Sequence, residues 1–128
     1  MSKVDTRLRQ LKPLADMLSQ AALRPVVEAR ARRDAVKARI DQIAAHRRAL
    51  LSVGADPILA AQMLAQAAQL RRLQMSETQA LARAEAHLAR AREAARRAYG
   101  REQILAEIEK QQIDARRRNA ERKRHRGI

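Results

Sequence analysis

The chain has 128 residues and a net charge of +14, and 46% of its residues are hydrophobic. Of the hydrophobic residues 28 are alanine and 26 are Leu, Ile or Val, so large side chains are too few to fill a wide globular core. The absence of cysteine excludes disulfides, thiolate metal sites and a cysteine nucleophile, and no apolar run approaches the roughly 18 residues of a membrane span.

Strong helix formers dominate the composition, and only three Gly and three Pro interrupt them. The sequence therefore predicts an all-α fold, an antiparallel two-helix coiled-coil hairpin with a longer C-terminal helix. We expect a single domain with a first helix over about 3–52, a turn at 53–56 and a second helix over about 57–124. The N-terminal residues lack the apolar stretch of a signal peptide, which favours a cytosolic protein.

The first predicted helix begins near Val4, because Ser2 and Asp5 resemble a capping box. Apolar residues then recur in alternating steps of three and four, as in a coiled-coil seam. Only Pro25, Arg33 and Arg47 depart from helix-compatible apolar residues in this seam. It consists of Val4, Leu8, Leu11, Ala15, Leu18, Ala22, Pro25, Ala29, Arg33, Val36, Ile40, Ile43, Arg47 and Leu50.

Two prolines lie inside this helix, at Pro13 and Pro25. Each removes a backbone donor and crowds the preceding turn. We expect a bend near Pro25 and a smaller one near Pro13, and the alternative is a break of the helix at Arg24.

The first helix should end at the segment from Ser52 to Pro57. Gly54 suits the left-handed position after a helix end, Asp56 is a good N-cap, and Pro57 fits the first helical position. Because so short a connection makes the next helix an antiparallel neighbour, we expect Leu50 beside Leu59.

By the same alignment, Ile43 should lie across from residues 63–66. The second helix should then extend past the first at the end that carries the termini. Its seam is interrupted at Glu77 and Glu102, and Gly100 is a weak point within it. The seam residues are Leu59, Met63, Leu70, Leu73, Leu81, Ala84, Leu88, Ala91, Ala95, Ala98, Leu105 and Ile108.

Residues 58–70 contain no charged side chain, although a third of the chain is charged. With Leu59, Met63 and Leu70 facing the first helix, three residues remain for another surface: Ile58, Leu64 and Ala65. We interpret these as a docking surface for a partner protein. The alternative is local packing beneath the hairpin turn.

Residues 114–126 carry seven Lys or Arg against two acidic residues. The candidate binding residues there are Arg116, Arg117, Arg118 and Arg122. They predict electrostatic docking to an acidic surface, and the alternative is a solvated tail.

Catalysis is poorly supported by the sequence. His46, His87 and His125 are scattered, and no nucleophile–base arrangement or glycine-rich phosphate loop is present. We expect a protein that is not an enzyme and that uses no cofactor and no metal.

Residues 101–118, REQILAEIEKQQIDARRR, resemble the flagellar type III export stalk proteins of the FliJ type and their injection-system relatives. Glu107, Gln111, Ile113, Asp114 and Arg117 occupy the positions typical of that family's C-terminal helix. The opening residues Leu8, Leu11 and Leu14 are similar to the family's first helix.

The resemblance implies a stalk or adaptor that hydrolyses nothing. Its terminal end would bind a hexameric export ATPase, its hairpin region would contact the membrane export gate protein, and export chaperones are further candidate partners. It would be cytoplasmic and peripherally associated with the inner membrane at the flagellar base, without a transmembrane segment. Membership of a flagellar or an injection system stays open.

Two alternatives remain. One is a basic nucleic-acid-associated coiled coil, which the net charge favours but the spread of basic residues and the single aromatic residue, Tyr99, disfavour. The other is a generic structural coiled coil that dimerises through alanine faces.

Overall fold

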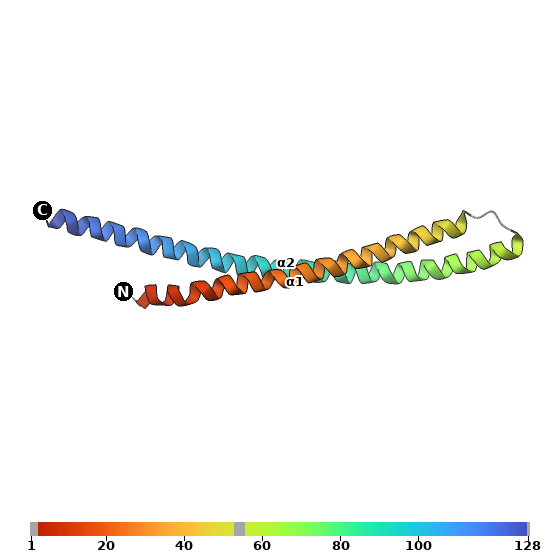
Figure 1. The fold of residues 1–128 in the computed structure, drawn as a ribbon, viewed down its shortest axis with the longest axis horizontal. Coiled ribbons are helices and arrows are strands. Elements are labelled where there is room, and N and C mark those ends of the chain that lie inside the picture. The colour runs from red at the N-terminus through yellow and green to blue at the C-terminus, as the bar shows by residue number, and fades with distance from the viewer. Residues whose placement is uncertain (1–2, 53–55, 128) are drawn as a thin grey trace. The chain divides into compact units, whose positions relative to one another are not determined.

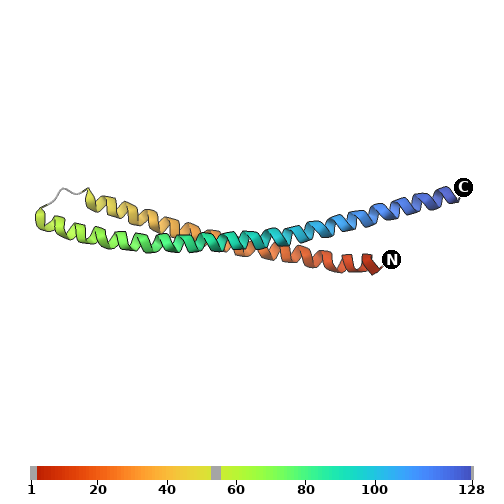
Figure 2. The same cartoon turned by 180° about the vertical axis from the view of Figure 1, so that it is seen from behind.

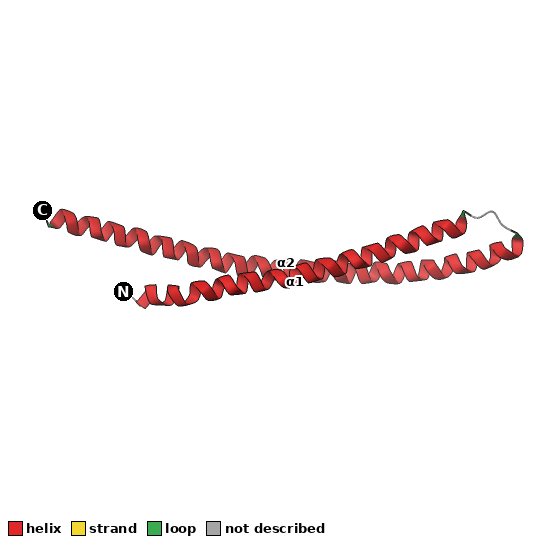
Figure 3. Cartoon of the chain, viewed as in Figure 1, coloured by secondary structure: helices red, strands yellow, loops and turns green. Residues whose placement is uncertain are grey.

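The two helices expected from the sequence make up almost all of the structure. A computed structural model describes residues 3–52 and 56–127. Within them the fold is all-α, and α1 (Lys3–Leu51) packs antiparallel to the longer α2 (Pro57–Arg126) (Figures 1 and 3). The expected fold class is confirmed.

Hydrogen bonds cap the C-terminal end of α1 and the N-terminal end of α2. The backbone N–H of Ser52 donates to the carbonyl of Arg48 at 3.1 Å, and the Ser52 hydroxyl donates to the carbonyl of Ala49 at 2.9 Å. At the start of α2 the N–H of Ala60 donates to the carbonyl of Asp56 at 2.9 Å, as expected for an N-cap residue. The positions predicted for Ser2 and Gly54 lie outside the described residues.

The prolines do not interrupt α1, which runs through both Pro13 and Pro25. The alternative of a break at Arg24 is therefore wrong, because neither proline is accompanied by another helix-stopping residue. Contacts nevertheless divide the chain into two units, and on α1 their boundary falls at Pro25. The terminal unit comprises residues up to Pro25 and from Arg92 onward, and the hairpin unit comprises Val26–Ala91.

In the hairpin unit the predicted seam of α1 is largely confirmed. Ala29 and Val36 are buried, and the other seam positions from residue 33 to residue 50 are half-buried. On α2 the buried residues are Ala67 and Leu88, whereas Leu59 and Leu73 are exposed. Met63 and Leu70 are half-buried as predicted, and a local rotation puts the half-buried Gln74 in the place of Leu73.

Polar contacts explain this rotation of α2. Arg39 Nε donates to Glu77 Oε2 at 3.1 Å, and Arg47 Nη1 donates to Gln74 Oε1 at 3.5 Å. Both acceptors are half-buried. Glu77, expected to interrupt the seam, therefore occupies it, and Leu73 is turned away.

The register also differs from the expected one. Leu50 lines a hollow together with Gln66 and Leu70, and the contact between Arg47 and Gln74 agrees with that alignment. The prediction that Leu50 lies beside Leu59 is wrong, and so is the placement of Ile43 opposite residues 63–66. Because the predicted alignment assumed that the helix ends meet directly, it missed a slip of about two turns.

This slip leaves the start of α2 without a neighbouring helix. With Leu50 opposite Gln66, about eight residues of α2, or about 12 Å, precede the last turn of α1. Figures 1 and 2 show these first turns of α2 extending past the end of α1.

In the terminal unit Leu8, Ala15 and Ala22 line the α1 seam as predicted, and the seam is rotated by part of a residue step at the positions between them. Asp5 and Ala15 are buried and Ser19 is half-buried, whereas the predicted seam residues Val4 and Leu18 are exposed. The other misplaced seam residues are Leu11 and Pro25, which are also exposed. The opposing half-buried residues of α2 include Ala95, Ala98, Leu105 and Ile108, as predicted.

Two ion pairs hold the register of the terminal unit. Arg116 donates to Asp5, and Lys12 Nζ lies 2.5 Å from Glu109 Oε2. By this alignment Lys3 lies opposite residue 118, so about eight residues of α2 continue past α1. The expected extension at this end is present, but it is shorter than predicted, because part of the extra length of α2 lies at the other end of the hairpin.

Candidate protein-interaction surfaces

The uncharged tip, which we define as residues 57–65, is the part of α2 that precedes the last turn of α1. Ile58 is 73% exposed and Leu64 is 61% exposed, and Ala65 is exposed as well. The structure thus places all three predicted docking residues on the surface. Leu59, which the heptad pattern placed in the seam, joins them on the surface.

The lack of charge in the tip is unusual for a helix with so few contacts. A helix surface exposed to water normally carries charged residues, and large exposed apolar side chains that lie together mark interaction sites. Here Ile58, Leu59 and Leu64 lie within two turns of one helix with no charged residue among them. The tip therefore offers apolar contact area without the cost of removing water from an ion.

The basic end, residues 114–126, divides into two parts. Arg117 and Arg118 line a shallow hollow with Asp114 and Glu121, so acidic neighbours on the same helix face partly offset their charge. Beyond this hollow the four basic residues are Arg122, Lys123, Arg124 and Arg126, and all are exposed. Positive charge is therefore most concentrated in the last turns of α2.

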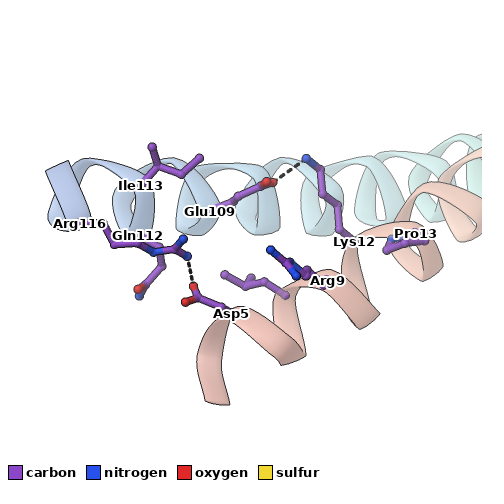
Figure 4. Close-up of a pocket in the computed structure, with 9 residues that line it drawn as sticks. Asp5, Arg9, Lys12, Pro13, Glu109, Gln112, Ile113 and Arg116 are labelled. Carbon is purple, nitrogen blue, oxygen red and sulfur yellow. Dashed lines mark hydrogen bonds and ion pairs between the residues drawn. The ribbon is translucent and has the colours of Figure 1, made fainter. Parts of the chain in front are cut away.

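Arg116 differs from the other candidate residues of the basic end. Its guanidinium donates to Asp5, whose side chain is nearly buried (Figure 4). The same open hollow between the helices is bordered by Lys12 and Glu109 (Figure 4). Arg116 is thus paired within the chain while its side chain stays 57% exposed, and its role in docking stays a prediction.

No local sequence pattern indicates this pair. Asp5 lies 111 positions from Arg116 and was interpreted as part of a helix cap. Its burial follows from the rotation of α1, which brings Asp5 in place of Val4 onto the seam. A buried carboxylate needs a partner, and the guanidinium supplies it.

The described residues offer contact area and charge for binding. Among residues 3–52 and 56–127, no group of three or more His, Asp or Glu side chains is arranged to hold a metal ion. Over the same residues no helix is long and apolar enough to cross a membrane. The two hollows described above that lie between the helices are open to solvent.

A scan against models of protein families found no match, nor did searches of curated proteins and of solved structures. The two surfaces of α2 and the resemblance of residues 101–118 are therefore the features that bear on function.

Proposed function

We propose that this chain is a non-enzymatic stalk or adaptor of the flagellar type III protein export apparatus. It binds the hexameric export ATPase through its basic end and the membrane export gate protein through its uncharged tip. The observation that carries the proposal is that α2 extends past α1 in both units, and that one extension is uncharged and apolar whereas the other is strongly basic. An adaptor needs two such separable docking surfaces.

The uncharged tip supports the gate contact. Apolar side chains that are exposed in the free protein become energetic anchors when a partner covers them, often contributing 1–2 kcal/mol or more each. Ile58 and Leu64 can be covered without breaking any contact with α1, because α1 ends before their level. Binding would therefore leave the hairpin unchanged.

The basic end supports the ATPase contact. Clustered positive charge attracts an acidic surface over a distance and accelerates association, more so at low salt. From about residue 119 onward this end lies past the start of α1, where a ring-shaped partner could surround a single helix. In this proposal the protein is cytoplasmic, lies at the inner membrane beneath the flagellum and does not hydrolyse ATP, and export chaperones remain further candidate partners.

The ATPase contact is tested by charge reversal. The variant Arg117→Glu/Arg118→Glu/Arg122→Glu leaves the Asp5–Arg116 pair intact. The matched control, Arg72→Glu/Arg83→Glu/Arg90→Glu, changes the net charge equally on exposed positions elsewhere on α2. Because exposed ionic contacts contribute roughly 0.2–1 kcal/mol each, we expect the first triple variant to weaken ATPase binding by about 10-fold or more and the control to weaken it much less.

Binding should be measured by interferometry against the hexameric export ATPase over a range of salt concentrations. Wild-type affinity should fall as salt rises. Equal losses in the two triple variants would contradict a localised contact. Tighter binding of duplex DNA than of the ATPase at physiological salt would favour the nucleic-acid alternative.

The gate contact is tested by Ile58→Gln/Leu64→Gln, with Leu73→Gln as the control. Leu73 is also an exposed leucine of α2, but it lies outside the tip. We expect the double variant to keep its melting temperature and to lose gate binding and motility, and the control to keep all three. A large fall in melting temperature would show that the tip is packed, and normal motility with normal stability would remove the tip from the functional account.

A further inference from the structure

The terminal unit carries an apolar surface that its own seam leaves uncovered. We define the α1 face as Val4, Leu11, Leu14, Met17, Leu18 and Ala21, all of which are exposed. Leu11, Leu14 and Leu18 recur in steps of three and four, so they lie on one side of α1. The buried seam residues Asp5 and Ala15 lie about a quarter turn away around the same helix.

This surface is large for a chain of this size. Five half-exposed Val, Leu and Met side chains together present on the order of 400 Å² of apolar area, comparable to the largest and often functional patch of a typical monomer. The alternating spacing is that of a coiled-coil seam. A second helix is therefore the shape that would cover it.

The charge around the α1 face differs from that of the rest of the chain. Residues 10–23 contain one Lys and one Asp. Residues 98–111, which lie beside them on α2, contain two basic and three acidic residues and thus have a net charge of −1. In a chain of net charge +14, this is a section where two copies could meet with little electrostatic repulsion.

We propose that the α1 face is the contact between two copies of this chain, with the two α1 helices packed antiparallel. In that alignment Leu14 of each copy packs against Leu18 of the other, and Leu11 packs against Ala21. All four layers around the two-fold axis are then apolar, so residues 11–21 of the face are complementary to themselves, as an isologous contact requires.

The rim of the contact favours a second copy over a charged partner helix. Coiled coils that select a different partner do so through charged residues beside the seam. Here the flanking positions beside the four central layers, on the outer side of the face, are the uncharged Gln10 and Met17, and the charged Lys3 and Arg24 lie one heptad further out. Each copy would bury on the order of 400 Å² of apolar area, well below the roughly 800 Å² per partner of a standard interface, so we expect weak association, with a dissociation constant on the order of 1–100 µM.

The dimer is tested by sedimentation equilibrium of the full chain across that concentration range. The apparent mass should rise from 14.5 kDa towards twice this value. Leu14→Gln/Leu18→Gln should raise the dissociation constant at least 10-fold. The matched control is Leu23→Gln, because Leu23 is as exposed as Leu18, at 57% against 60%, but points away from the α1 face.

A monomer at every concentration would overturn the proposal, and so would an equal effect of the control variant. The orientation is tested by single cysteines, since the chain has none of its own. An equal mixture of Leu14→Cys and Leu18→Cys should cross-link faster than either variant alone. Fastest cross-linking of Leu14→Cys alone would indicate a parallel contact and overturn the antiparallel arrangement.

This inference does not depend on the proposed function. The α1 face includes neither the uncharged tip nor the arginines of the ATPase test. Loss of dimerisation with normal ATPase binding, or the reverse, would therefore distinguish the two.

Discussion

Replacing Leu88 with alanine removes the largest of the buried side chains among the described residues, since Leu88 is 2% exposed and the others are Ala, Val and Asp. Leu→Ala substitutions in well-packed cores cost about 2–5 kcal/mol, the higher values where a cavity persists. A seam between only two helices can close partly around the missing atoms. We therefore expect a loss of about 2–3 kcal/mol in the free energy of unfolding.

The informative comparison is Leu73→Ala, because the sequence pattern places Leu73 in the same seam whereas the structure leaves it 47% exposed. This variant should lose less than about 1 kcal/mol, since little apolar area returns to water. Urea unfolding followed by circular dichroism measures both, with the slope as a check that each variant unfolds in one transition. Equal losses would refute the seam described for α2.

Two further pairs of variants test weak points of the helices. Gly100 is helical, has no positive φ and has no neighbouring atom within 4 Å of an added Cβ. Gly100→Ala should therefore stabilise the folded protein by about 1 kcal/mol, measured by thermal melting. Ala94→Gly, at an exposed position of the same helix, should destabilise it by a similar amount. Arg47 Nε is buried without a hydrogen-bond partner, so Arg47→Leu/Gln74→Leu should raise the melting temperature. Gln74→Leu alone should lower the melting temperature, because it removes the one acceptor described for the guanidinium. A lower melting temperature for the double variant would contradict this account.

Fold class was predictable from composition and spacing. An alanine-rich chain with few large apolar residues can form a thin helical seam, and the heptad pattern indicates which residues line it. The start of α2 at Pro57 followed from the preference of Asp and Pro for the first helical positions. These signals are local, and so they could be recognised in a single sequence.

The register was not predictable in this way. A heptad pattern repeats every seven residues, so a slip of one heptad pairs equally apolar positions, and alanines discriminate poorly between alignments. The contacts that decide the alignment join residues far apart in sequence, such as Arg39 with Glu77 and Asp5 with Arg116. Such pairs have many equivalents in a chain with 28 basic residues.

The seam of the terminal unit was misassigned for a related reason. Apolar residues occupy two adjacent sides of α1, one containing Leu8 and Ala15 and the other containing Leu11 and Leu18. A sequence pattern merges these into one wide stripe, but a two-helix pair covers only part of it. The uncovered part is the α1 face, which became recognisable only when α2 was placed.

Register also determines which residues are available to partners. If Leu50 lay beside Leu59, most of the uncharged tip would pack against the last turns of α1, and Leu64 would lie opposite a neighbouring helix. The observed slip of about two turns removes that neighbour and exposes Ile58 and Leu64. It follows that an insertion of seven residues in α2 between the tip and Gln66 should preserve the seam while moving the tip by about 10 Å, and under the proposed function it should impair gate binding without lowering stability.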